Sequence, residues 1–217
     1  MEQVGPATPS VVSRIERQPN TVERRSDKRH LTVLRVGKIM SGAHEELCMI
    51  RNISSGGLMA HIYCSHEMGE QVSIEIKNGH VMSGRIVWTE GFMVGIEFDE
   101  RIDVLHFLAN EQTDLLLGKV PRAPRLRAQT AVVVRRGAHY VHAEIEDISQ
   151  GGAKVSEGNA FDADDDVVLM VHGLPPRHGT VRWRKSGQAG ISFNEPIPFE
   201  ALAQWIARQG QREGAAN

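Results

Sequence analysis

The sequence predicts a mainly β protein, with two small antiparallel barrels in tandem and an α-helix at the C-terminal end of each. Three observations support this fold class: a unit that repeats at a fixed offset, segments in which apolar and polar residues alternate, and an amphipathic helical pattern that closes each copy. A chain of 217 residues is long enough for two domains that each bury a core.

One six-residue segment occurs twice, 95 residues apart. Residues 52–57 read Asn-Ile-Ser-Ser-Gly-Gly, and residues 147–152 read Asp-Ile-Ser-Gln-Gly-Gly. Solenoid units are only about 20–50 residues long, so this offset indicates two copies of a whole domain. Further pairs keep the same offset: Trp88 and Trp183, Gly95 and Gly190, Ile96 and Ile191, and Phe98 and Phe193.

Alternation with a period of two predicts strands in both copies. It covers Val72–Ile76 and Val94–Phe98 in the first copy and Val141–Ile145 in the second. One face of each such strand is expected to line a core. The glycines expected to separate strands are Gly79, Gly84, Gly91 and their counterparts.

Helical patterns and composition place the domain boundaries. Apolar residues at helical spacing run from Ile102 to a stop at Gly118 and from Phe199 to a stop at Gly210, and such a helix can plug one end of a small barrel. The segment Gly118–Pro124 has two prolines and no alternation. The predicted parts are a flexible N-terminal tail (1–22), a first barrel (23–118), a second barrel (119–210) and a C-terminal tail (211–217).

Charge is distributed unevenly along the chain. The formal net charge is −2, but residues 14–38 carry a net +5 and residues 119–136 a net +6. The balanced total excludes a uniformly basic nucleic-acid coat. No apolar run approaches the roughly 18 residues of a membrane span, and residues 1–10 lack the pattern of an export signal. We therefore expect a cytoplasmic protein without membrane insertion.

No catalytic or metal site is predicted. The sequence lacks a phosphate loop, a dinucleotide-binding glycine pattern, a nucleophile elbow and a Cys-x-x-Cys pair. His61, Cys64 and His66 have no apparent fourth ligand and would alternate between two faces, so surface and core filling is the favoured interpretation. The run Asp162–Asp166 lacks the features of a calcium loop and is interpreted as a solvated turn. Cys48 and Cys64 are expected to be reduced thiols.

Each positive segment precedes an Asn/Asp-x-Ser-x-x-Gly segment by about twenty residues. Arginines on a flexible arm can grip phosphate oxygens and stack on purines. An Asn or Asp side chain can accept from a guanine edge, a Ser hydroxyl can reach a phosphate or fix the turn, and a Gly lets a ligand approach the backbone. Together these elements match a small, doubly phosphorylated guanine ligand, although each alone is typical of a solvated surface or a turn.

Two motifs and the strand pattern give the chain a resemblance to a known family. Arg25-Ser-Asp-Lys-Arg29 and residues 52–57, followed by Gly84-Arg-Ile-Val-Trp88 and Gly95-Ile-Glu-Phe98, resemble the PilZ domain family, whose signatures are Arg-x-x-x-Arg and Asp/Asn-x-Ser-x-x-Gly. The resemblance covers about residues 23–117 and 121–208. It implies six-stranded barrels with a C-terminal helix that bind the bacterial second messenger cyclic di-GMP.

The resemblance also implies roles for individual residues of the first copy. Arg25 and Arg29 would clasp the phosphates and guanine faces of the ligand, with Arg24 beside them. The barrel-side wall of the site would consist of Asn52, Ser54 and Gly57.

The second copy departs from the family pattern in its arm. Its barrel motif is complete, but residues 122–127 contain no two arginines four positions apart. Arg125 is the best counterpart of Arg29, since it lies 22 residues before Asp147 and Arg29 lies 23 before Asn52. A barrel kept for packing and partner contact is the other interpretation. The candidate ligand residues of this copy are Arg122, Arg125, Arg127, Asp147, Ser149 and Gly152.

The leading hypothesis is a cyclic di-GMP receptor that is not an enzyme and has no cofactor. Ligand phosphates would neutralise the repulsion between arm arginines, dock the arm and change the interdomain arrangement, thereby regulating a protein partner of unknown identity. The alternative is a protein-interaction scaffold in which one or both nucleotide sites are lost. An RNA-binding barrel is less favoured, because aromatic residues are only 5% and no stacking platform is evident. No nucleic-acid polymer is therefore expected as a partner.

Overall fold

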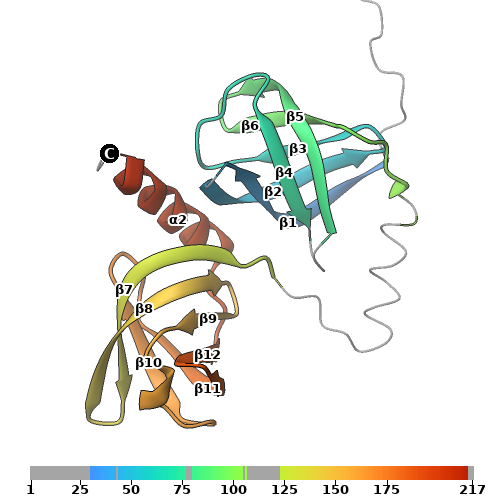
Figure 1. Cartoon of the computed structure of the whole chain (residues 1–217). Coiled ribbons are helices and arrows are strands. Elements are labelled where there is room, and N and C mark those ends of the chain that lie inside the picture. The colour runs from blue at the N-terminus through green and yellow to red at the C-terminus, as the bar shows by residue number, and fades with distance from the viewer. Residues whose placement is uncertain (1–29, 43, 77–79, 105, 107–122, 215–217) are drawn as a thin grey trace, which may run out of the picture.

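Two closed six-stranded antiparallel barrels form the protein (Figure 1). The computed structural model describes residues 30–42, 44–76, 80–104, 106 and 123–214. The predicted fold class, two small barrels in tandem, is confirmed. Both barrels have the same strand order, as a duplicated unit requires.

The first barrel closes by pairing its first and fourth strands. Around the barrel the order is β1-β2-β3-β6-β5-β4, and β1 pairs with β4 from Gly37 to Met40. Closure leaves no unpaired sheet edge. The strands are β1 (His30–Ser41), β2 (His44–Ser54), β3 (Gly57–His61), β4 (Gln71–Ile76), β5 (His80–Glu90) and β6 (Met93–Phe98).

The second barrel repeats this plan. Its order is β7-β8-β9-β12-β11-β10, with β10 closing on β7. The elements are β7 (Leu126–Arg136), β8 (His139–Ser149), β9 (Gly152–Val155), the short 3-10 helix η1 (Gly158–Ala160), β10 (Asp166–Val171), β11 (Arg177–Lys185), β12 (Gln188–Phe193) and the helix α2 (Phe199–Gly214).

Alternation along the strands builds each core as expected. In β4, Val72, Ile74 and Ile76 are buried and the residues between them are not. Fully burying one such side chain contributes about 1.5–3 kcal/mol. Gly84 was expected to separate strands but lies inside β5, where a Cβ would overlap the carbonyl oxygen of Glu97 on β6.

Helix α2 packs against both barrels and lies between them (Figure 1). Leu202, Trp205 and Ile206 belong to the core of the second barrel, and the Trp205 indole donates to the carbonyl oxygen of His172 at 2.8 Å. Leu47 of β2, which is 1% exposed, joins the same apolar cluster from the first barrel. The predicted helix is therefore also part of the interdomain contact. It ends at Gly214, past the predicted stop at Gly210.

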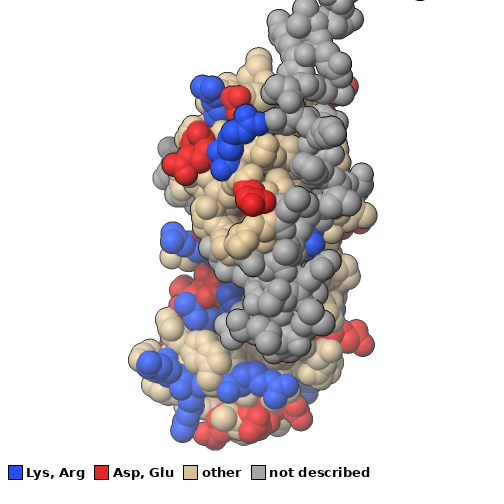
Figure 2. All heavy atoms as spheres, turned by 90° about the vertical axis from the view of Figure 1, so that its right-hand side faces the viewer, with Lys and Arg blue, Asp and Glu red and all other residues tan. Residues whose placement is uncertain are grey.

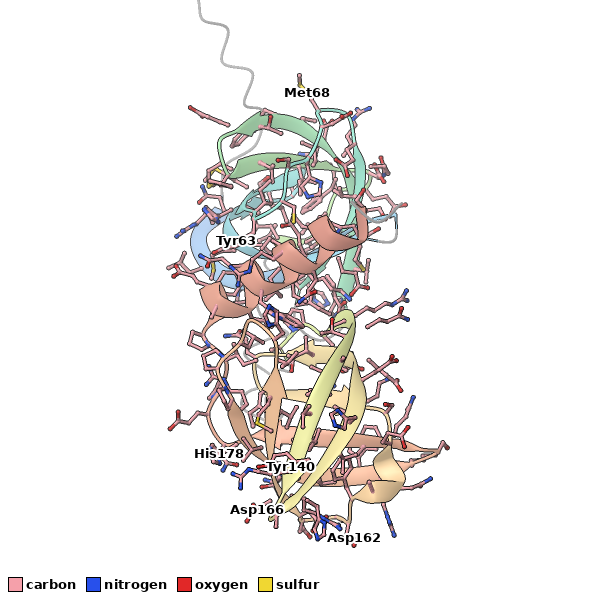
Figure 3. The ribbon with its side chains drawn as sticks, turned by 90° about the vertical axis from the view of Figure 1, so that its left-hand side faces the viewer. Tyr63, Met68, Tyr140, Asp162, Asp166 and His178 are labelled. Carbon is pink, nitrogen blue, oxygen red and sulfur yellow. The ribbon has the colours of Figure 1, made fainter. Side chains whose placement is uncertain are left out.

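Aromatic rings extend this contact at the start of α2. The ring of Tyr63, which follows β3, lies 5.9 Å from the ring of Phe199 in an edge-on arrangement. Figure 3 shows Tyr63 beside α2, whereas Tyr140 and Asp162 lie at the far end of the second barrel. Most of the helix predicted after the first barrel lies outside the described residues. Within the part of the chain that the structure describes, no helix is long and apolar enough to cross a membrane.

Candidate functional site

The Asn-x-Ser-x-x-Gly segment of the first barrel forms the turn between β2 and β3. The Ser54 hydroxyl donates to the carbonyl oxygen of Gly57 at 3.1 Å and so closes the turn. At Gly57 a Cβ would overlap the carbonyl oxygen of Ile96 on β6. The glycine is therefore required for the close approach of β3 to β6, in addition to any ligand contact.

A cavity of about 380 Å³ lies over this turn on the outer face of the barrel. One row of cross-strand neighbours crosses it, from Asn52 to Met59, then Gly95, then Trp88. The structure thus brings the three predicted wall residues of the first copy together with side chains from β5 and β6. The lining residues are Asn52, Ile53, Ser54, Gly56, Gly57, Leu58, Met59, Val87, Trp88, Gly95, Ile96, Glu97, Phe98 and Arg101.

The indole of Trp88 covers Gly95, and this contact shapes the cavity wall. A Cβ at Gly95 would overlap the Trp88 ring, so only glycine lets the ring lie against the strand. An indole fixed in this way is a platform on which a purine can stack. From the sequence, Trp88 was identified only as a marker of the repeat, and its role as a platform was not predicted. Two features of the sequence could have indicated this role. Trp88 recurs as Trp183 at the fixed offset, and each tryptophan precedes a Gly-Ile-x-Phe strand.

Charged side chains rim the first cavity. A second cross-strand row runs from Ser54 to Gly57 and Glu97, and Arg85 lies 3.2 Å from Glu97. Beyond β6, a guanidinium nitrogen of Arg101 donates to the Ser55 hydroxyl at 3.4 Å. The cavity thus offers a cation, Arg101, and a carboxylate, Glu97, beside the motif turn, and neither was predicted from the sequence.

The predicted arm of the first site lies outside the described residues. Arg24, Arg25 and Arg29 all precede His30, where the description begins. Arg122 of the second arm is likewise outside it. The ligand roles of these four residues remain predictions.

The second barrel carries the equivalent wall. The Ser149 hydroxyl donates to the carbonyl oxygen of Gly152 at 3.3 Å, as in the first copy. The matching row runs from Asp147 to Lys154, then Gly190, then Trp183. The Trp183 indole covers Gly190, so the platform is repeated as well.

Arg125 lies at this second wall, as its position 22 residues before Asp147 led us to expect. Its guanidinium forms a short ion pair with the Asp147 carboxylate. On the other side, the Lys154 ammonium lies 3.3 Å from Asp147 and 3.1 Å from Glu146. Asp147 is therefore paired with two cations of its own barrel.

The backbone of the second arm is held by the first barrel. The Lys38 ammonium donates to the carbonyl oxygen of Arg125 at 3.1 Å, and the Arg127 amide donates to Glu45 at 2.9 Å. Lys38 is 8% exposed and lies 2.9 Å from Glu75. The Arg127 guanidinium also lies 3.7 Å from Glu45. Arg127 is also the cross-strand neighbour of Asp147 at the second wall, and its predicted role as a ligand residue remains a prediction.

His61, Cys64 and His66 do not converge on a common point. The His66 ring lies 2.6 Å from Glu46 and 3.1 Å from Glu70, whereas Cys64 lies 3.3 Å from His44. The ring of His61 stacks edge-on against Tyr63, 4.9 Å away. Within the described ranges, no group of three or more His, Cys, Asp or Glu side chains is placed to hold a metal ion.

Glu46 is the centre of a buried polar cluster at one end of the first barrel. It is 0% exposed, and one carboxylate oxygen accepts from the amides of Tyr63 and Cys64, each at 2.9 Å. The other oxygen contacts His66. The hydrogen bond to Glu46 raises the pKa of His66 despite the opposing effect of burial. The cluster therefore places the His66 ring between two carboxylates, which favour its protonated form.

Both thiols are expected to be unreactive in the native protein. Burial, reinforced by the nearby Glu46 carboxylate, raises the pKa of Cys48 and raises that of Cys64 to about 12. At pH 8 we expect iodoacetamide to label neither cysteine in the folded chain and both after denaturation, as mass spectrometry would detect. Rapid labelling of native Cys48 would contradict this prediction.

The acidic run lies in a turn, as predicted, and is ion-paired. The Asp162 amide donates to Asp165 at 2.7 Å, and Asp165 lies 2.9 Å from Arg136. The hydrogen bond from Arg136 lowers the pKa of Asp165. Arg184 pairs with Asp162 at 3.2 Å. Figure 2 shows basic and acidic side chains side by side at this end of the second barrel.

Comparison with known proteins matches both halves of the chain to one family model. The model of the PilZ domain matches residues 23–109 and 120–208. A comparison with curated proteins found no match.

The solved structures that match the chain share little sequence with it. PlzA of Borreliella burgdorferi, in complex with c-di-GMP, is 15% identical, with 81% of this chain and 88% of that chain covered and a TM-score of 0.37. The Bacillus subtilis inhibitor of motility (MotI/DgrA) is 14% identical, with 85% and 99% covered and a TM-score of 0.33. YcgR of Escherichia coli, in complex with c-di-GMP, is 10% identical, with 84% and 86% covered and a TM-score of 0.33.

Proposed function

Because the chain belongs to the PilZ domain family, we propose that it is a non-enzymatic receptor for cyclic di-GMP. The observation that carries this proposal is the cavity of the first barrel, where Asn52 and Ser54 of the family motif lie beside the Trp88 platform. A cyclic dinucleotide presents flat purines and two phosphodiester anions, and this wall with its arginine arm offers a partner for each.

Each part of the first site has a separate task in binding. The Asn52 amide can accept from and donate to a guanine edge, and the Trp88 indole can stack on the base. Arg25 and Arg29 of the arm supply bidentate cations for the phosphates. Arg101, which lines the cavity, adds a guanidinium on the barrel side. Ser54 fixes the turn that presents Asn52.

The second arm couples the ligand to the arrangement of the two barrels. The Arg125 guanidinium belongs to the second wall, whereas its carbonyl oxygen is held by Lys38 of the first barrel. A ligand phosphate that draws Arg125 away from this position competes with the Lys38 contact. Loss of the contact between Lys38 and Arg125 changes the arrangement of the two barrels. A protein partner that binds only one of these arrangements would respond to the ligand.

Replacing Lys38 with methionine tests this coupling. The change removes the ammonium that joins Arg125 to Glu75 and leaves both acceptors without that donor. We expect the ligand-free scattering profile of Lys38→Met to shift towards the ligand-bound profile of the unmodified chain. The control is Lys185→Met, on the exposed end of β11. An unchanged free profile together with an unchanged ligand response would refute the coupling.

Calorimetry on the intact chain tests the receptor function itself. Cyclic di-GMP should bind saturably, and cyclic di-AMP, which has the same phosphates but different base edges, should bind much more weakly. Equal affinity for the two would show that the phosphates alone are recognised and would contradict guanine recognition by Asn52. Affinity should fall as salt is added, because the arginine contacts are screened.

A further inference from the structure

The second arm lacks the Arg-x-x-x-Arg spacing that the family pattern requires. Arg125 is at the wall, and the Arg127 backbone pairs with Asp147 there, but the Arg127 guanidinium is largely exposed and its Nε lies 3.7 Å from Glu45 of the first barrel. A dianionic ligand held by Arg125 alone would leave one phosphate without a bidentate cation. Without the paired arginines of the first arm, this barrel needs further cations to hold both phosphates.

The wall of the second barrel has basic residues at two positions where the wall of the first barrel has apolar residues. The register of the repeat aligns Met59 with Lys154, since each pairs with the motif Asn or Asp on one side and with a glycine on the other. The same register aligns Val87 with Arg182, because each lies in the irregularity just before the platform tryptophan. Two apolar positions around the first cavity thus become basic in the second wall.

Further sequence differences between the two walls favour binding of an anion at the centre of the second wall. Glu97, which lines the first cavity, is replaced by Ser192 at the matching position beside Gly152. The rim cations of the first copy, Arg85 and Arg101, are replaced by Thr180 and Pro196. Positive charge has therefore moved from the rim to the strands next to the tryptophan platform.

On the basis of the proposed function, we infer that Lys154 and Arg182 compensate for the absent Arg-x-x-x-Arg spacing and make the second barrel a cyclic dinucleotide site. Lys154 directs its ammonium at Asp147 and Glu146, 3.3 and 3.1 Å away, which leaves one of its three donors for a phosphate oxygen. Arg182 is exposed and has no acidic partner among the residues that the structure describes. Lys154 lies in the row that ends at Trp183 and Arg182 directly precedes Trp183, so a base stacked on this indole would have a cation on either side.

Calorimetry on a chain with the first site emptied tests this inference. In an Arg25→Ala/Arg29→Ala background, cyclic di-GMP should still bind with one equivalent. Adding Arg182→Val or Lys154→Met, each of which installs the first-copy residue, should weaken that binding roughly 10- to 100-fold, as loss of a charged hydrogen bond does. Lys185→Met is the control for general charge and should leave the affinity unchanged.

The outcomes separate this inference from the proposed function. If the intact chain binds cyclic di-GMP but the background chain does not, the first barrel is the receptor and the inference is overturned. Binding by the background chain that neither Arg182→Val nor Lys154→Met weakens would overturn it too. If the intact chain does not bind at all, the receptor function itself is wrong.

Discussion

The affinity of the first site for cyclic di-GMP is expected to fall by about 10- to 150-fold when Arg29 is replaced with alanine. This range corresponds to one hydrogen-bonded charge on a phosphate, worth about 1.5–3 kcal/mol. Calorimetry would measure this loss. Combining Arg29→Ala with Arg182→Val, which weakens the second site, separates the loss at the first site from binding at the second.

Lys28→Ala is the matched control for this variant. Lys28 lies between Arg25 and Arg29 and carries the same charge, but it is not part of the Arg-x-x-x-Arg spacing. We expect Lys28→Ala to change affinity far less than Arg29→Ala. Equal losses would mean that the arm acts only through its net charge, and the proposed bidentate role of Arg29 would then be wrong.

Replacing Glu46 with valine is expected to destabilise the protein by about 3–5 kcal/mol. Glu46 is fully buried, and its removal leaves the amides of Tyr63 and Cys64 and the ring of His66 without their acceptor. Denaturant unfolding monitored by circular dichroism would measure the loss. A change in the free energy of unfolding below about 1 kcal/mol is what an ordinary exposed ion pair contributes. Such a small change would contradict a stabilising role for this buried polar cluster.

The second barrel supplies the compensating change. Positions 46 and 66 of the first copy correspond to Val141 and Phe161 of the second, and Phe161 is 0% exposed in its core. Glu46→Val combined with His66→Phe therefore installs an apolar pair that the same fold already accommodates. We expect the double variant to recover part of the stability, because apolar replacement of a buried ion pair is often neutral or stabilising, whereas the amides of Tyr63 and Cys64 still lack their acceptor.

The cluster also makes stability depend on pH in a defined direction. The pKa of His66 is raised in the folded state, so its contribution is complete below the ordinary value of 6.5 and is lost as the pH rises through the raised value. Unfolding measured from pH 6 upward should show this loss in the unmodified chain. The Glu46→Val/His66→Phe variant should not show it.

The barrels could be predicted because each strand has a local alternation of apolar and polar residues, and because the whole pattern occurs twice in the chain. Alternation at Val72–Ile76 and Val94–Phe98 identified strands, and the fixed offset of 95 residues showed that both halves share one fold. The packing of α2 on β2 was not predictable in this way. It joins elements from different domains, and no periodic pattern specifies which surface a helix covers.

The polar cluster and the platforms were missed for a different reason. Alternation along β2 places Glu46 on the same inward face as Cys48, which conflicts with the usual exposure of glutamate. The two copies differ here in a paired way, because Glu46 corresponds to Val141 and His66 corresponds to Phe161. This joint change from polar to apolar was the signal that Glu46 and His66 interact. The role of Trp88 depended on cross-strand register, which brings it opposite Gly95 and two strands away from Met59.

The most direct test of the receptor account is an NMR titration that follows the three indole N–H signals of the chain. Trp88 lines the first cavity, and Trp205 is 1% exposed in α2. Saturation with cyclic di-GMP should shift the Trp88 signal strongly and leave that of Trp205 nearly unchanged. A Trp88 signal that does not move at saturating ligand would contradict the assignment of this wall as the binding site.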